Sequence, residues 1–208
     1  MGVIGEVVAA ALGTFPHIVC VDDGSTDGSA DAALAAGAVV VPHPVNLGQG
    51  AALKTGIDFA VAQPGADFIV TFDADGQHRV EDAFAMVQRL DAEPLDVVLG
   101  SRFLEGATKV GWSKRLVLRL AVAFERLGTR LRLTDAHNGL RAFTCDAARR
   151  IEITQNRMAH ASEIVAEIAR NRLRYAEQPV EVLYTAYSRA KGQSLWNSIN
   201  ILVDLFNI

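Results

Sequence analysis

The sequence predicts an α/β domain whose mostly parallel central sheet is flanked by helices. Two apolar runs that are typical of buried strands, 17–21 and 68–72, each end in acidic residues, and an Ala-rich helix follows the first. The length of 208 residues, 50% of them hydrophobic, suits one domain with a substantial core. We therefore treat residues 1–208 as a single domain.

The predicted elements follow in the order that such a sheet requires. They are an apolar-faced helix over 4–12, a strand over 17–21, an Ala-rich helix closed by Gly37, a strand over 38–42, a helix opening within 46–56, the strand over 68–72, a basic helix over 114–131, a strand over 180–184 and a largely apolar helix over 195–206. Small residues open the 46–56 helix, so either a backbone segment or a phosphate can approach its amino end.

Two carboxylates and an amide follow the strand at 68–72. Asp73 and Asp75 lie two residues apart directly after it, and Gln77 comes next. Ligands of open α/β sheets bind outside the carboxyl ends of the strands. Asp75 and the amide oxygen of Gln77 are ligands of the kind that Mg²⁺ or Mn²⁺ prefers. The alternative is a solvated Asp-rich turn.

A second acidic strand end follows residues 17–21. Asp22, Asp23 and Gly24 open the segment Asp-Asp-Gly-Ser-Thr-Asp, whose later residues are good helix caps. Capping does not explain the two leading carboxylates, so a second part of the same site is expected here. Lys54 lacks the surrounding residues of a Walker phosphate loop.

Five ordered motifs together resemble the family 2 glycosyltransferases, specifically the dolichol- and polyprenol-phosphate mannose and glucose synthases. They are Asp-Asp-Gly-Ser-Thr-Asp-Gly at 22–28, Asn-Leu-Gly-Gln-Gly-Ala-Ala at 46–52, Phe-Asp-Ala-Asp-Gly-Gln-His at 72–78, Gly-Ser-Arg-Phe at 100–103 and Asn-Gly-Leu-Arg-Ala-Phe at 138–143. The resemblance implies a GT-A (nucleotide-diphospho-sugar transferase) fold with a Rossmann-like sheet. It also implies inverting transfer of a hexose from GDP-mannose or UDP-glucose to a polyprenyl or dolichyl phosphate.

The resemblance also implies roles on the donor side, which is carried by residues 1–100. Asp75 and Gln77 would hold Mg²⁺ or Mn²⁺, which would stabilise leaving-group charge. The other donor residues would be Asp22 or Asp23 at the base, with Gly24 and Lys54, Asp73 at ribose or sugar hydroxyls, and Arg141 with Lys191 at the diphosphate.

Residues 101–208 would form the acceptor half. The residues expected at the lipid phosphate are Arg102, Arg115 or Arg119, and Arg189 and Ser194 of the basic loop. A lipid phosphate is already anionic at neutral pH, so a general base is optional. Glu163 is the residue at the corresponding family position, and it is equally compatible with a structural helix carboxylate. The expected catalytic set is Asp73, Asp75, Arg102 and Glu163.

Charge is divided unevenly along the chain. Residues 1–100 carry a net −11 and residues 101–208 a net +7. The acidic half suits a metal and sugar hydroxyls, and the basic half suits phosphates and anionic lipid. The basic helix at 114–131 is compatible with a membrane surface or with an ordinary solvated face. With a pI near 5.7 and no interleaved aromatic and basic pattern, nucleic acid is not an expected partner.

The remaining sequence features concern location. Two cysteines make no disulfide framework, which indicates a reducing compartment. No signal peptide and no apolar stretch of the ~20 residues needed for a spanning helix is visible. We expect a cytoplasmic protein, peripheral at the cytoplasmic face of the membrane.

One departure from the family and two rival functions complete the expectations. Relatives open with a strand of the type Val-Val-Ile-Pro-Ala-Tyr-Asn-Glu, whereas this sequence starts within the first helix, so one strand edge and part of the base-binding wall are expected to be exposed. Residues 73–76 also match the nucleophile turn of haloacid-dehalogenase-type phosphatases, although Gln77 replaces the usual Thr or Val. A truncated, inactive nucleotide-binding module is the second rival.

Overall fold

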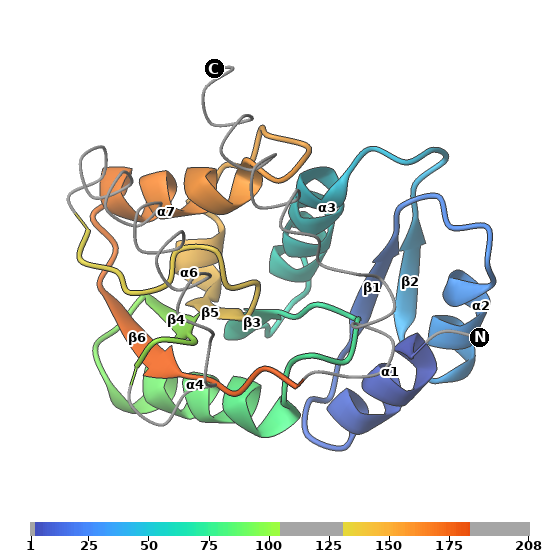
Figure 1. The fold of residues 1–208 in the computed structure, drawn as a ribbon, viewed down its shortest axis with the longest axis horizontal. Helices are drawn as coiled ribbons and strands as arrows, with labels where there is room; N and C mark the ends of the chain where they lie inside the picture. The colour runs from blue at the N-terminus through green and yellow to red at the C-terminus, as the bar shows by residue number, and fades with distance from the viewer. Residues whose placement is uncertain (1–2, 105–130, 184–208) are drawn as a thin grey trace.

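The computed structural model describes residues 3–104 and 131–183 (Figure 1). The predicted helix at 195–206 and all but the last residue of the helix at 114–131 lie outside these ranges. The same holds for five predicted site residues, which are Arg115, Arg119, Arg189, Lys191 and Ser194.

Helices and strands alternate through most of the chain, as the α/β class requires. The helices are α1 (Ile4–Leu12), α2 (Ser29–Ala35), α3 (Gln49–Val61), α4 (Val80–Ala92), α6 (Cys145–Ala148) and α7 (His160–Arg170). The strands are β1 (Val19–Asp22), β2 (Val39–Pro42), β3 (Phe68–Thr71), β4 (Val97–Ser101), β5 (Arg141–Thr144) and β6 (Tyr175–Pro179).

The strands form two sheets. In the first, β1 pairs with β2 in parallel. In the second, the order is β3-β5-β4-β6, with β4 parallel to β6 and β5 antiparallel to both of its neighbours. The sheet is therefore mixed, since β5 is reversed between strands that share one direction. An antiparallel neighbour needs no crossover helix, so the chain can enter β5 directly from the preceding loop.

The predicted strand at 180–184 is wrong in position. The observed strand, β6, covers Tyr175–Pro179 and pairs with β4 from Val97 to Ser101. The Val180 amide still donates to the Ser101 carbonyl, but β4 ends there and provides no further partner. Local alternation of apolar residues therefore did not locate the strand, because the length of β4 determines where β6 ends.

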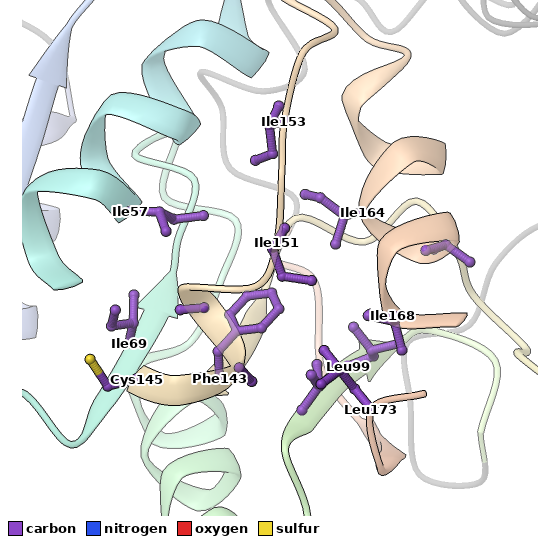
Figure 2. Packing of buried hydrophobic residues seen from close by; sticks show 14 of the residues in the cluster. Ile57, Ile69, Leu99, Phe143, Cys145, Ile151, Ile153, Ile164, Ile168 and Leu173 are labelled. Atoms are coloured by element: carbon purple, nitrogen blue, oxygen red, sulfur yellow. The ribbon is translucent and has the colours of Figure 1, made fainter. Parts of the chain in front are cut away.

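Both faces of the four-stranded sheet are covered. Figure 1 shows α6 and α7 on one face and α4 on the other. Figure 2 shows Phe143 of β5 among Ile164 and Ile168 of α7 and Ile151, and all four belong to one buried cluster. On the opposite face, Met86 of α4 is fully buried in a second cluster. The prediction that the strand at 68–72 is covered on both sides is confirmed.

Helix α3 connects the two sheets. It packs against β1 of the first sheet and β3 of the second (Figure 1). Its residue Gly56 lies against the Val21 side chain, and Ile57 packs with Ile69 in the main core cluster. Within the described residues, β1 and β3 share no strand pairing, so α3 supplies much of the contact between the sheets.

The amino end of α3 is approached closely by another backbone segment. The Gly50 amide donates to the Asn156 carbonyl over 2.8 Å. A Cβ at Gly48 would overlap the Asn156 carbonyl oxygen, and one at Gly50 would overlap the Gln155 carbonyl oxygen. The small residues at this helix end allow either a backbone segment or a phosphate to approach it. In the structure, a backbone segment lies there.

We predict that Gly50→Ala destabilises the protein by about 1–3 kcal/mol, because the new methyl group collides with a backbone carbonyl that cannot move freely. Gly5→Ala is the matched control, since Gly5 is also helical and its added Cβ meets only the Ala32 carbonyl at an ordinary 3.7 Å. That variant should be neutral or stabilised by up to ~1 kcal/mol. Thermal melts of both variants measure the difference, and equal melting temperatures would contradict the packing described.

Candidate functional site

A cavity of about 240 Å³ lies beside the first sheet, lined by residues of α1, β1, α2 and β2 and of the turn that follows β3. Cys20, Asp22 and Ser29 line it from β1 and α2, and Ala74 and Asp75 line it from the turn after β3. The volume is below the ~300–1,000 Å³ typical of sites for whole drug-sized ligands, so the cavity suits one part of a larger ligand. Both predicted acidic strand ends therefore meet at one place, and Asp22 and Asp75 contribute to the same wall.

Asp73 is a carboxylate of the site that several neighbouring groups hold in place. Its Oδ2 lies 3.2 Å from His78 Nε2, and its Oδ1 accepts from Gln49 Nε2 at 3.4 Å. Burial raises the pKa of Asp73, but the hydrogen bond with His78 and nearby positive charge, including that of the buried Arg141, outweigh this effect. The pKa therefore lies below its ordinary value, and the group is held as a carboxylate with 38% of its side chain exposed.

Asp75 lies in a different electrostatic environment. Its Oδ1 accepts from the Gln77 amide at 2.9 Å. Burial raises the pKa of Asp75, and the nearby Asp73 raises it further, while the Gln77 hydrogen bond opposes both. Two close carboxylates of this kind have excess negative charge that a bound cation relieves.

The residues present fit a metal that is shared with a ligand. Within the described ranges, no three His, Cys, Asp or Glu side chains converge to hold an ion by themselves. Mg²⁺ and related ions commonly take only one or two protein carboxylates and complete their shell with substrate phosphates. The carboxylate of Asp75 and the side-chain amide oxygen of Gln77 are oxygen ligands of the kind that such a shared ion needs.

The two carboxylates after β1 have separate functions. Asp22 lines the cavity and accepts the Ser25 amide at 3.3 Å. Asp23 is fully engaged elsewhere, because it accepts the Leu47 and Gly48 amides at 2.8 and 2.7 Å and contacts His43 Nδ1 at 2.7 Å. Of the two candidates for base contact, the structure thus places Asp22 at the cavity and Asp23 under the 43–48 loop.

Two other residues that were predicted to bind the nucleotide-sugar donor have specific contacts in the structure. Gly24 has φ +76°, and a Cβ there would come within 2.9 Å of the Asn46 amide nitrogen, so glycine is required beside the loop. Lys54 forms an i,i+4 ion pair of 2.7 Å with Asp58 on α3, with 46% of its side chain exposed. Its predicted contact with the donor needs a different side-chain position.

Arg102 pairs with a buried carboxylate. Its Nε and one terminal nitrogen donate to Asp135 at 2.6 and 2.8 Å, and its amide donates to the same group at 3.1 Å. The Asp135 side chain is 1% exposed and that of Arg102 20%. Burial raises the pKa of Asp135, but the hydrogen bonds and the charge of Arg102 lower it by more than burial raises it. The Asp135 pKa is therefore below its ordinary value, and Arg102 and Asp135 form an ion pair. Arg102 therefore anchors the 131–140 loop through Asp135.

Arg141 and Glu163 also have structural contacts. Arg141 is 2% exposed in β5, where its charge helps to lower the pKa of Asp73. Glu163 accepts the Thr154 and Gln155 amides at 2.9 Å and the Thr154 hydroxyl at 2.5 Å. It thereby fixes the segment that packs on α3. The diphosphate role of Arg141 and the base role of Glu163 stay predictions.

Three residues near Asp73 received no role from the sequence. Gln49 and His78 contact its carboxylate, and a Cβ at Gly139 would overlap it. His78 and Gly139 are members of the motifs at 72–78 and 138–143, so membership in those motifs was an available signal. Their contact with Asp73 depends on tertiary packing, which motif spacing alone does not specify.

The fold and the site define an α/β protein with an acidic centre at strand ends. The comparison with known families then gives the class: residues 2–156 match the model of glycosyl transferase family 2. The chain belongs to this family, and it is a glycosyltransferase with the GT-A fold. The family assignment rules out the phosphatase alternative, and the α/β prediction is confirmed.

Individual relatives agree with this assignment. An uncharacterised protein of Methanocaldococcus jannaschii is 34% identical over 92% of this chain and 80% of its own length. A UDP-N-acetylglucosamine–dolichyl-phosphate N-acetylglucosaminyltransferase of Methanococcus voltae is 32% identical over 80% and 68%. Polyprenol monophosphomannose synthase of Mycolicibacterium smegmatis is 30% identical over 92% and 74%.

Solved structures show the same fold. Glucosyl-3-phosphoglycerate synthase of Mycobacterium tuberculosis superimposes with a TM-score of 0.73 at 19% identity, over 99% of this chain and 75% of that one. The same enzyme in complex with Mn²⁺ and UDP-glucose gives a TM-score of 0.71 at 20% identity, over 99% and 73%. At these identities the likeness concerns the fold alone.

We predict that Asp23→Asn lowers the free energy of unfolding by about 1–3 kcal/mol at pH 7, because an amide has one acceptor oxygen where the carboxylate uses two. Burial raises the Asp23 pKa, but the Leu47 amide, His43 and the Gly48 amide together lower it below normal. The carboxylate's stabilisation is thus present above the unfolded-state pKa of about 3.9 and lost as the pH falls through the folded value.

The measurement is a series of thermal melts from pH 7 to pH 3. The gap between wild type and Asp23→Asn should narrow below about pH 4. Asp91→Asn, on an exposed residue of α4, is the control and should change little at any pH. A gap that stays constant down to pH 3 would show that the ionised carboxylate does not hold the loop.

Proposed function

We propose that this glycosyltransferase moves a hexose from a nucleotide-sugar to a polyprenyl phosphate, with inversion at the transferred carbon. The observation that carries the proposal is the cavity lined by Asp22 and Asp75, in a chain of this family. Its named relatives act on dolichyl phosphate and polyprenol phosphate. GDP-mannose, UDP-glucose and UDP-N-acetylglucosamine are the donor candidates.

The donor occupies the region between the first sheet and the turn that follows β3. The nucleoside lies in the cavity, with Asp22 at its polar edge. Asp73 contacts ribose or sugar hydroxyls, which suits a carboxylate held ionised and oriented by its neighbours. This placement leaves the diphosphate beside Asp75 and Gln77 at the mouth of the cavity.

Asp75 and Gln77 hold a divalent ion, Mg²⁺ or Mn²⁺, on that diphosphate. When bound, the ion supplies neutralisation of the charge that develops on the leaving nucleotide. Arg141 adds a buried positive charge below the carboxylates, and Lys191 is proposed to reach the diphosphate from the carboxy-terminal loop. The close packing of Gln155 and Asn156 on α3 makes that helix end unsuitable for phosphate, which increases the need for the cation.

The acceptor phosphate lies on the basic side of the chain. Arg102 is the described candidate, and the remaining candidates are Arg115, Arg119, Arg189 and Ser194. A phosphate oxygen already carries negative charge at neutral pH, so it attacks without prior loss of a proton. Glu163 is then not needed as a base, in agreement with its contacts to Thr154 and Gln155.

The proposed location is the cytoplasmic face of a membrane, where polyprenyl phosphates are accessible. None of the helices in the described ranges is both long and apolar enough to cross a bilayer. The net charge of +7 over residues 101–208 favours anionic lipid, and each Lys or Arg near such a surface contributes ~1 kcal/mol. The basic helix predicted at 114–131 is the proposed contact.

We predict that Asp75→Ala abolishes the Mn²⁺-dependent binding of the donor, because the cation loses one of two protein oxygen ligands. Isothermal titration of UDP, GDP and the three nucleotide-sugars, each with Mn²⁺ and with EDTA, measures this and identifies the donor. Asp91→Ala is the matched control and should bind as wild type does. Unchanged metal-dependent affinity in Asp75→Ala would overturn the metal assignment, and a wild-type protein that binds donor without transfer would support an inactive module.

We also predict that Arg102→Ala raises the KM for polyprenyl phosphate at least tenfold while donor affinity stays unchanged, because a phosphate-clamping Arg acts only on the acceptor. The variant also leaves the Asp135 carboxylate buried and unpaired, at a cost of about 3–5 kcal/mol. The double variant Arg102→Ala/Asp135→Ala removes that orphaned charge. It should regain stability without regaining acceptor use, and recovery of both would show that Arg102 has a structural function only.

A further inference from the structure

His78 is buried in the site without an assigned function. Its side chain is 6% exposed and its Nε2 lies 3.2 Å from Asp73 Oδ2. The ring packs edge-on against Phe72, with centroids 5.5 Å apart and an interplanar angle of 71°. Two contacts, one polar and one aromatic, therefore fix the ring in a single orientation.

The second ring nitrogen indicates which hydrogen the ring carries. His78 Nδ1 is buried and has no hydrogen-bond partner within the described residues. A hydrogen on Nδ1 would be a buried donor without an acceptor within the described residues, which is unfavourable. A hydrogen on Nε2 is satisfied by the Asp73 carboxylate. Of the two neutral tautomers, the one with its hydrogen on Nε2 is therefore favoured by these surroundings.

Asp73 is constrained from the other sides as well. Gln49 Nε2 donates to Oδ1 at 3.4 Å, and the backbone at Gly139 lies so close that a Cβ there would overlap the carboxylate. These contacts leave the carboxylate little freedom to rotate. Of the two donors, His78 provides the shorter hydrogen bond and the more buried side chain.

We propose that His78 is a positioning residue that orients the Asp73 carboxylate for donor recognition by a hydrogen bond from Nε2. The proposal rests on the function proposed above, in which Asp73 contacts hydroxyl groups of the donor. A carboxylate that is fixed before binding loses less rotational freedom when the donor arrives, so its hydrogen bonds to the donor gain in strength. His78 itself acts through Asp73 and need not touch the donor.

The first test uses a pair of variants at one position. His78→Gln places an amide N–H near the position of Nε2, whereas His78→Leu keeps the approximate volume and removes the donor. With saturating Mn²⁺, we expect His78→Leu to weaken affinity for the bound nucleotide-sugar about tenfold and His78→Gln to stay within about threefold of wild type. Equal affinity of His78→Leu and wild type overturns the proposal. Equal loss in both variants also overturns it, since packing on Phe72 would then explain the effect.

The second test is a double-mutant cycle with Asp73. If His78 acts through that carboxylate, His78→Leu should have no further effect on donor affinity in an Asp73→Ala background. Additive losses would show an independent function for His78 and overturn the proposal. Thermal melts of the four proteins identify any loss that comes from unfolding.

The third test needs no nucleotide. Long-range ¹H–¹⁵N spectra of the histidine rings distinguish the two tautomers, and the His78→Gln spectrum identifies the signal of His78 among the five histidines. We expect the Nε2-protonated form in wild type and its loss in Asp73→Ala. An Nδ1-protonated ring in wild type overturns the proposed hydrogen bond. A correct tautomer in a protein that binds no nucleotide-sugar would reject the function proposed above and confine His78 to a structural contact.

Discussion

The three hydrogen bonds of Asp23 set the position of most of the site. Its carboxylate fixes Leu47 and Gly48 at the end of the 43–48 loop, and helix α3 begins at the next residue. Gln49, the first residue of that helix, donates a hydrogen bond from its side chain to Asp73. The amide of the next residue, Gly50, donates to the Asn156 carbonyl. One carboxylate after β1 therefore determines how α3 meets both the turn after β3 and the segment before α7. A change at Asp23 would be transmitted to Asp73 without any direct contact between them.

Local features of the sequence predicted what depends on neighbours along the chain. The apolar runs before Asp22 and Asp73 predicted β1 and β3, because a strand that is covered by other elements is rich in apolar residues. Gly37 predicted the end of α2 and has φ +101°, which other residues rarely adopt. The two acidic strand ends converge at one cavity although β1 and β3 belong to different sheets, and α3 packs against both strands.

Features that depend on distant pairings were not predictable. Nothing near Arg102 in the sequence indicates its pairing with Asp135, because the two groups meet only after β4 and the 131–140 loop are in place. Glu177 is a similar case, since it accepts the Thr134 and Asp135 amides from β6. The displacement of β6 has the same origin, namely a partner strand that ends at Ser101. Side-chain chemistry thus indicated which residues are candidates for the site, and tertiary contacts determine which groups each of them binds.

The division of the strands into two sheets has a mechanical consequence. The cavity is lined by residues of the first sheet, such as Cys20 and Asp22, and by Ala74 and Asp75 of the turn that follows β3 of the second sheet. A ligand bound there would contact the first sheet and the turn that follows β3, and its binding free energy would add to the free energy needed to separate these two parts. Amide hydrogens of β1 and β3 would then slow their exchange with solvent together, although no hydrogen bond joins the two strands. A ligand bound in this cavity would therefore add to the cohesion of the molecule.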